Sequence, residues 1–188
     1  MERVLTLALG GLLFIASARA DLQLTPKLVE YELDGAKLQQ LVFPDGERRI
    51  TYTPPTGWQY SSSNSNLFIL HPGGGRGEAT ITRTSLARPE TFDDQTIKRL
   101  SEEVLLSVPG DAKNVAIVSQ EKNVVIIERK ETLLIIIKYD FYGEPTERSV
   151  LFVNRGNEQL RFQLTCPKAN FAALQKVFLG SHFSWQNL

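Results

Sequence analysis

The chain has 188 residues and equal numbers of basic and acidic side chains, 21 Lys or Arg against 21 Asp or Glu. This balance lacks the excess of positive charge that is typical of a nucleic-acid-binding surface, so we expect no nucleic-acid partner. Cys166 is the single cysteine, which excludes an internal disulfide. A chain of this length is long enough to form one domain with a substantial apolar core.

Residues 1–20 have the features of a cleavable signal peptide. Arg3 precedes an apolar run over residues 4–16, which as a helix is too short to cross a hydrocarbon layer of about 30 Å. Ala18 and Ala20 then place small residues at the −3 and −1 positions, and this pattern predicts cleavage after Ala20. The alternatives are a buried N-terminal helix and an uncleaved anchor.

Cleavage after this segment leaves residues 21–188, which we expect to form a single domain. Without Arg3, Arg19 and Glu2, the remaining chain has 19 basic and 20 acidic residues and a net charge near −1. It contains no second apolar run long enough to span a membrane, so we expect no transmembrane segment. The predicted location is periplasmic or secreted.

Short β-strands account for most of the predicted secondary structure. The predicted strands are residues 28–33, 38–43, 49–53, 67–70, 115–119, 124–128, 133–141, 150–153 and 160–166. Residues 61–66 (Ser-Ser-Ser-Asn-Ser-Asn) predict a polar loop, and residues 78–86 are extended without a clear buried face. Short polar turns separate the later strands, which indicates antiparallel neighbours because a parallel crossover needs a dozen residues or more.

A first helix is predicted over residues 94–107. The apolar residues that recur there at helical spacing are Ile97, Leu100, Val104 and Val108. Thr91 and Asp94 have the spacing of a capping box at its start, and Pro109-Gly110 ends it.

A second helix is predicted over residues 168–179. Pro167 is suited to its first turn, and Gly180 is suited to the position after its last turn. The predicted apolar stripe consists of Phe171, Leu174, Val177 and Phe178.

The order of these elements favours an α+β fold. Residues 124–127 and 133–137 are apolar at consecutive positions, which indicates strands that are covered on both faces. With two helices available, the layered arrangement that we predict is an α-β-α sandwich, a central and mostly antiparallel sheet with helices on both faces.

A glycine-rich run, residues 73–77, follows His71 and contains Arg76. A phosphate-binding loop requires Gly-Lys-Ser/Thr at the start of a helix, whereas this run leads into a predicted strand. We interpret it as a flexible hairpin tip, with anion contact through Arg76 as the alternative. The candidate binding residues are His71, Arg76 and Tyr60.

Neither a metal site nor a catalytic set is predicted. The two histidines, His71 and His182, have no cysteine or second histidine at zinc-binding spacing. No Gly-x-Ser-x-Gly motif marks a nucleophilic serine. The acidic residues near turns are Asp93, Asp94, Asp140, Glu144 and Glu147. We interpret them as helix caps and solvated turns because EF-hand spacing is lacking, with a calcium site as the alternative.

Cys166 is predicted to be a buried and inert core residue. Leu160, Phe162 and Leu164 alternate with polar residues along the same predicted strand, so the thiol falls on its apolar face. A reactive thiol and an intermolecular disulfide are the alternatives.

Two groups of residues resemble the PsbP/Mog1-like family. Pro54-Pro55-Thr56-Gly57-Trp58 is similar to the Pro-Gly-Trp turn of that family. A charged strand over residues 147–153, the sequence Thr165-Cys166-Pro167, a Phe-bearing helix and an aromatic terminal segment are similar to its C-terminal part. The resemblance covers residues 48–187. Ser181-His182-Phe183 departs from the pattern by an inserted His.

The resemblance implies an α-β-α sandwich and a non-enzymatic protein. We therefore expect an exported, non-enzymatic binding or accessory module of a bacterial cell envelope. The expected partner is a protein, the expected state is a monomer or weak oligomer, and no cofactor is predicted. A small-ligand or cation carrier and a hydrolase are the alternatives, and no binding residue of the family is carried over.

Overall fold

The computed structural model describes residues 22–63, 65–70 and 77–188. The predicted signal peptide, with its cleavage position at Ala20, lies outside these residues. The strands are β1 (Lys27–Leu33), β2 (Ala36–Asp45), β3 (Arg48–Tyr52), β4 (Gln59–Ser63), β5 (Asn66–Leu70), β6 (Glu78–Ser85), β7 (Lys113–Lys122), β8 (Thr132–Phe141), β9 (Glu144–Asn154), β10 (Glu158–Pro167) and β11 (Gln186–Asn187). The helices are α1 (Asp94–Leu106), α2 (Lys168–Ser181) and the short 3₁₀-helix η1 (His182–Ser184).

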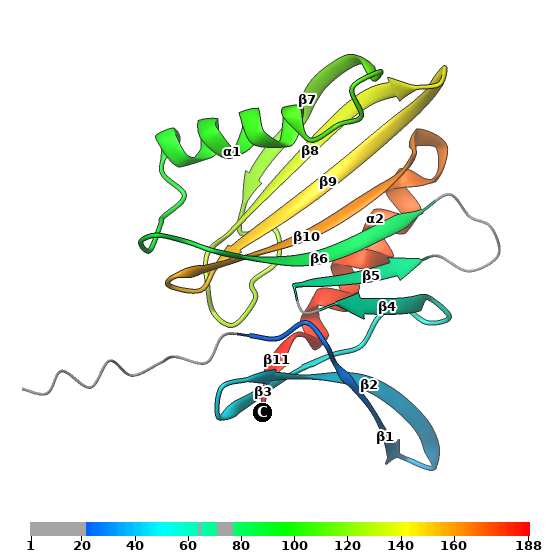
Figure 1. Cartoon of the computed structure of the whole chain (residues 1–188). Helices are drawn as coiled ribbons and strands as arrows, with labels where there is room; N and C mark the ends of the chain where they lie inside the picture. The colour runs from blue at the N-terminus through cyan, green and yellow to red at the C-terminus, as the bar shows by residue number, and fades with distance from the viewer. Residues whose placement is uncertain (1–21, 64, 71–76) are drawn as a thin grey trace, which may run out of the picture.

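The strands form two antiparallel sheets (Figure 1). A seven-stranded sheet has the order β4-β5-β6-β10-β9-β8-β7, and a four-stranded sheet has the order β1-β2-β3-β11. Tight turns with positive φ join several neighbours, such as Asp34-Gly35 between β1 and β2. In a two-residue hairpin this conformation matches the right-handed twist of the strands.

The predicted α-β-α sandwich with helices on both faces is wrong. The described part of the chain is mostly antiparallel β-structure in two sheets, with only two α-helices. Neither helix forms a layer over the seven-stranded sheet, because α1 contacts mainly β7 and β8 and α2 contacts mainly β9 and β10. The strands at the front of the chain form the second sheet instead of extending the first.

Strand β8 shows how the core is divided. Leu133, Ile135 and Ile137 belong to a cluster that includes the buried side of α1. Leu134 and Ile136 point the other way, into a larger cluster built from α2, the four-stranded sheet and the rest of the seven-stranded sheet. The expectation that this strand is covered on both faces is confirmed.

Helix α1 begins and ends slightly differently from the prediction. Its N-cap is Asp93, whose side chain accepts a hydrogen bond from the Thr96 amide at 2.7 Å, so the capping box through Thr91 is wrong. The helix ends at Leu106 with Ser107 as its C-cap, before Pro109 is reached. Asp93 satisfies one of the free amides at the helix start, as a carboxylate at this position does.

Helix α2 runs through Gly180 to Ser181 and continues into η1. Phe171 and Phe178 are buried, as predicted. Val177, which the stripe included, is 49 % exposed, whereas Gln175 is buried. Gln175 lies on the buried side because its Oε1 accepts a hydrogen bond from Ser149 Oγ of β9 at 2.5 Å.

Two segments differ in type from the prediction. Residues 61–63 belong to β4 rather than to a loop, and all five side chains of that strand are exposed. Residues 124–128 form an irregular connection with an isolated bridge between Ile127 and Lys130, although Val125 and Ile127 are buried. Neither apolar character nor polarity alone decides whether a segment pairs with a neighbour.

Candidate binding face

In the described part of the chain, no helix covers β10, β6, β5 and β4 on one face of the seven-stranded sheet. Helix α1 lies over the β7–β8 end on this side (Figure 1). Because directly paired residues of antiparallel strands share a face, the registers define its rows. The first row contains Arg161, Thr82, Asn66 and Ser63, and the second contains Gln163, Thr80, Phe68 and Ser61. The third row contains Thr165 and Glu78. We call these residues the open face.

The opposite side of the same strands explains why this side stays open. Leu160, Phe162 and Leu164 of β10, with Ala79 and Ile81 of β6, are buried in the larger core cluster. Their neighbours in sequence must point away from that cluster, since successive side chains of a strand alternate between faces. At these strands the antiparallel sheet therefore has one packed and one solvated face.

The side chains of the open face are mainly hydroxyls and amides. Thr80, Thr82 and Gln163 are half-buried, so a partner can contact them. Thr165 is also half-buried, but its hydroxyl already accepts a hydrogen bond from Arg148. Phe68 adds an exposed aromatic ring in the middle row. This combination offers hydrogen-bond donors and acceptors around one apolar contact, which suits a polar protein surface.

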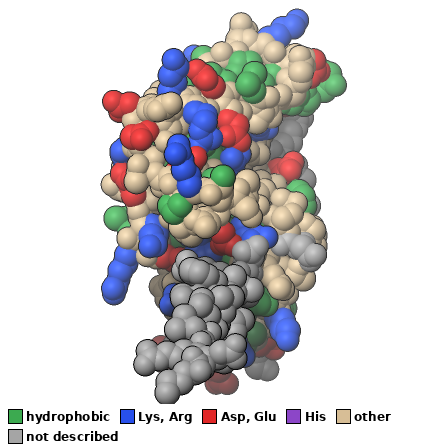
Figure 2. Space-filling model, turned by 60° about the vertical axis from the view of Figure 1, so that its left-hand side comes forward, with side chains coloured by type: hydrophobic (Ala, Val, Ile, Leu, Met, Phe, Trp, Pro, Cys, Tyr) green, Lys and Arg blue, Asp and Glu red, His purple; other side chains and the backbone are tan. Residues whose placement is uncertain are grey.

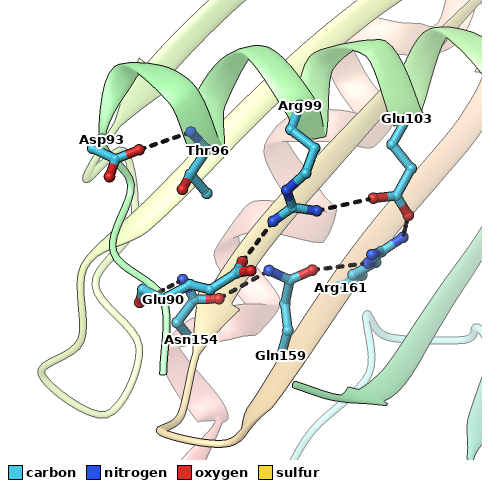
Figure 3. A network of polar contacts seen from close by, with 8 residues as sticks. All are labelled: Glu90, Asp93, Thr96, Arg99, Glu103, Asn154, Gln159 and Arg161. Carbon is cyan, nitrogen blue, oxygen red and sulfur yellow. Dashed lines mark hydrogen bonds and ion pairs between the residues drawn. The ribbon is translucent and has the colours of Figure 1, made fainter. Parts of the chain in front are cut away.

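A closed ring of polar contacts joins α1 to the β9–β10 hairpin beside the open face (Figure 3). The ring consists of Glu90, Arg99, Glu103, Arg161, Gln159 and Asn154. Arg99 Nη2 lies 2.6 Å from Glu90 Oε2, and the Asn154 amide donates to the Glu90 carbonyl at 3.0 Å. The ring therefore connects the helix to two strands through side chains.

The charges within this ring are balanced, because two arginines face two glutamates. Arg161 forms an ion pair with Glu103 and donates to Gln159 Oε1 at 3.1 Å. Its guanidinium also lies over the Phe152 ring, 5.2 Å from the centroid. We conclude that the ring positions α1 as a wall of the open face and presents no net charge.

Arg148 fixes the other end of α1. Its buried guanidinium donates to the Ser107 carbonyl at 2.9 Å and to Thr165 Oγ1 at 2.9 Å. It forms no ion pair with any described residue. The C-terminal carbonyls of a helix carry partial negative charge, so Arg148 stabilises the end of α1. Burial raises the pKa of the neighbouring Tyr139, although Arg148 opposes the shift.

Charged side chains are mixed over the face shown in Figure 2. Positive and negative groups alternate there without a patch of one sign. A uniform electrostatic surface of the kind that attracts a polyanion is therefore lacking on this view.

The three predicted binding residues are not brought together among the described residues. His71 and Arg76 lie outside them. Tyr60 lies on edge strand β4 opposite Ile69, a buried residue of the larger core cluster. Tyr60 is therefore on the side of the sheet that faces away from the open face.

Two of the acidic residues near turns have local hydrogen-bond partners. Asp93 caps α1, and hydrogen bonds from the Thr96 backbone and side chain lower the pKa of its carboxyl group. Asp140 accepts a hydrogen bond from the Asn114 amide at 2.6 Å. No three His, Cys, Asp or Glu side chains among the described residues are grouped to hold a metal ion.

A shallow cleft lies near the end of β8. Its volume is about 550 Å³, and it is lined by Asp111, Lys113, Asp140, Tyr142 and Gly143. The carboxylates and the lysine ammonium partly offset each other's charge, and Tyr142 is exposed on its rim. Nothing in this lining favours one class of ligand.

Cys166 and His182, the other two side chains considered in the sequence analysis, are both buried. Cys166 lies in the larger core cluster as predicted, and burial raises the pKa of its thiol to about 11. His182 is also fully buried, with its ring 4.5 Å from that of Phe162 and 4.6 Å from that of Phe178. Neither side chain reaches the open face.

Sequence reasoning missed the open face, although part of its signal was present. The alternation of Arg161, Gln163 and Thr165 with apolar residues predicts a solvated face on β10. The partner strands gave no such signal, because residues 78–86 have an irregular pattern and the serines of β4 were predicted to form a loop. Only the strand registers place these segments side by side.

No family model and no curated protein sequence matches the chain. Among solved structures, cyanobacterial PsbP from Synechocystis sp. PCC 6803 is similar with a TM-score of 0.52 and 14 % identity, over 96 % of this chain and 98 % of that one. LpqN, involved in cell envelope biogenesis of Mycobacterium tuberculosis, is similar with a TM-score of 0.50 and 13 % identity, over 88 % of this chain and 90 % of that one. The chain therefore has a PsbP-like fold. Membership of the PsbP/Mog1-like family stays a prediction.

Proposed function

We propose that the chain is an exported, non-enzymatic accessory module of a bacterial cell envelope, and that it binds a protein partner through the open face. The observation that carries this proposal is the set of half-buried hydroxyl and amide side chains on β6 and β10. They lie beside the wall formed by α1. LpqN, a structural neighbour involved in cell envelope biogenesis, supports the envelope role.

The open face is held rigidly, which favours binding. Its strands carry the larger apolar core on their opposite side, and the polar ring and Arg148 fix α1 at both ends. A surface that is ordered before binding loses less conformational entropy when a partner docks. The conformation of β6 and β10 should therefore change little on binding.

The chemistry of the face favours a hydrogen-bonded interface over a strongly charged one. Arg161 is already paired with Glu103, which balances its charge. Glu78 is the acidic residue in the three rows of the open face. A protein interface commonly combines an apolar anchor with about ten hydrogen bonds. Phe68 supplies the anchor, and Thr80, Thr82 and Gln163 supply the polar contacts.

Site-specific photo-cross-linking tests this proposal. A photoreactive amino acid replaces Thr82, Gln163 or Ser61 on the open face, or Glu121 on β7 as the control, and the protein is produced in a bacterial envelope. We expect the same adduct from the three open-face positions and none from position 121. Adding Thr80→Arg should remove the adduct because a long cation blocks the middle row.

Two results would contradict this proposal. Equal adducts from position 121 and from the open face would show that the contact is unspecific. A reproducible adduct that survives Thr80→Arg would place the partner elsewhere on the molecule.

Export is tested separately. Mass spectrometry of protein from a periplasmic fraction should find Asp21 as the N-terminal residue. In the described part of the chain, neither α-helix is long and apolar enough to cross a membrane. A product that keeps Met1 and stays in the cytoplasmic fraction would exclude an envelope role.

A further inference from the structure

The β1–β2 hairpin forms a two-stranded ribbon at one end of the molecule (Figure 1). Strand β2 pairs with β1 over residues 36–42 but with β3 only over residues 41–45. The described side chains between residues 27 and 39 are all exposed. Because an isolated pair of strands is marginally stable in water, a third strand would stabilise this ribbon.

The two faces of the ribbon differ in chemistry. Val29, Tyr31 and Leu38 share one face, where they are 40 %, 38 % and 37 % exposed. Glu30 and Glu32 lie on the other face of β1 with Leu28, and the register places Lys37 of β2 opposite Glu32. Glu30 accepts a hydrogen bond from the Gln39 amide at 2.8 Å. The edge strand β1 therefore presents apolar side chains on one face and two carboxylates on the other.

Strand β1 also has a backbone edge without a partner strand in the described part of the chain. It is the first strand of its sheet, and among the described residues it pairs with β2 alone. Leu33 and Ala36 close the two-residue turn, so they form the first hydrogen-bonded pair of the hairpin. Since hydrogen-bonded pairs alternate along an antiparallel ladder, the amide and carbonyl groups of Glu30 and Glu32 point away from β2.

We propose that β1 binds an extended segment of a partner protein in which apolar and basic residues alternate. The segment adds a strand to the free edge and bonds to the outward amide and carbonyl groups. Its apolar side chains extend the face of Val29 and Tyr31, and its basic side chains meet Glu30 and Glu32. This surface is separate from the open face.

A second copy of this chain fits the edge less well. Antiparallel pairing of two β1 strands about Glu30, the middle residue of Lys27–Leu33, places the two Glu30 side chains directly opposite each other. Like charges in that position are destabilising. The acidic pair therefore opposes self-pairing and favours a basic partner strand.

Fluorescence anisotropy with defined peptides tests the proposal. The probe is a labelled seven-residue peptide that alternates lysine and valine, and the comparison peptide alternates glutamate and valine. We expect saturable binding of the lysine peptide and at least about 10-fold weaker binding of the glutamate peptide, since two cross-strand charge pairs change sign.

Two variants locate the bound peptide. Glu30→Pro removes an amide that points outward, so it should abolish peptide binding while the melting temperature of the protein stays nearly unchanged. Glu30→Lys combined with Glu32→Lys should weaken binding of the lysine peptide about 10-fold and keeps the backbone intact. Glu102→Lys with Glu121→Lys makes the same charge change elsewhere and should leave binding unchanged.

Three outcomes would overturn the proposal. The lysine peptide does not bind the wild type, or it binds Glu30→Pro as tightly as the wild type. The third is a dimer in light scattering that Glu30→Pro dissociates, because the edge would then be occupied by a second copy.

Discussion

The carboxylate of Glu128 accepts a hydrogen bond from the indole N–H of Trp185 at 3.1 Å, although the two residues are 57 positions apart. Its second oxygen accepts from Arg155 Nε at 2.9 Å. Arg155 in turn pairs with Asp45 at 2.6 Å and with Glu158 at 3.1 Å. This cluster connects both sheets, the β7–β8 connection and the C-terminal segment.

Removing Arg155 should strongly destabilise the protein. Its side chain is 10 % exposed and faces three carboxylates. Burial lowers the pKa of the guanidinium, but the neighbouring carboxylates outweigh this effect, so the pKa is raised. Arg155→Ala leaves the carboxylates close together without a counter-charge, so the free energy of unfolding should fall by about 3–5 kcal/mol. Urea denaturation measures this change.

The exposed Arg129 is the matched control for Arg155. Arg129→Ala should change the free energy of unfolding by no more than about 0.5 kcal/mol. Equal effects of the two substitutions would show that the cluster contributes nothing specific.

The turn that presents Glu128 is strained. Glu128 and Arg129 have φ of 51° and 59°, a left-handed conformation that costs most residues about 1 kcal/mol and costs glycine little. Arg129→Gly should therefore stabilise the protein by about 0.5–1 kcal/mol. Glu128→Gly relieves the same strain but should destabilise the protein, because the contacts to Arg155 and Trp185 are lost. Thermal unfolding distinguishes the two, and stabilisation by both would show that those contacts are dispensable.

Burial of His182 should make stability depend on pH. Desolvation lowers the pKa of its imidazole to about 3, and both ring nitrogens lack a hydrogen-bond partner among the described residues. In the unfolded chain the imidazole has its ordinary pKa of about 6.5. Between pH 6.5 and 3 the unfolded state therefore binds the extra proton, and stability falls as the pH is lowered.

The size of the His182 effect can be isolated by substitution. This group alone should contribute a slope approaching about 1.4 kcal/mol per pH unit in that window. His182→Leu removes the titrating group and should flatten the dependence of urea denaturation on pH. The same slope in both proteins would assign the acid sensitivity to other groups.

Cys166 should react slowly while the protein is folded. The thiol is buried, and its pKa of about 11 leaves little thiolate at neutral pH. Ellman's reagent should label it slowly in native buffer and rapidly in denaturant. Fast labelling of the native protein would mean that β10 opens frequently or that the thiol is accessible.

Helix α2 provides a graded series of substitutions. Phe178→Ala should open a cavity and lower the free energy of unfolding by about 3–5 kcal/mol. Gln175→Ala leaves the buried Ser149 hydroxyl without its acceptor, so we expect a loss of about 1–3 kcal/mol. Val177→Ala, at a position that is half exposed, should cost much less than Phe178→Ala. Equal losses for Val177 and Phe178 would mean that α2 packs through a different side.

Sequence patterns correctly predicted the elements whose apolar side chains are buried in the core. The apolar positions of β8 and the aromatic residues of α2 follow this rule, as does Cys166 on the apolar side of β10. The patterns failed at β4, because serines that are exposed on both faces carry no periodicity. They also failed at Gln175, whose burial depends on a hydrogen bond to a distant strand.

The candidate site was less predictable than the fold. Tyr60 was selected for its residue type, yet its position on the α2 side follows only from pairing with Ile69. Thr80 and Thr82 are ordinary strand residues until the register places them beside Gln163 and Arg161. Long-range pairing determines such a surface, and local sequence contains little information about it.

The position of Trp185 determines when the protein can finish folding. Its ring packs on Phe43 and Phe162, and β11 directly after it completes the four-stranded sheet. A chain that emerges from the ribosome or a translocation pore with its N-terminus first cannot close this core until Trp185 has emerged. Nascent chains stalled before that residue should therefore remain sensitive to protease and accessible to chaperones.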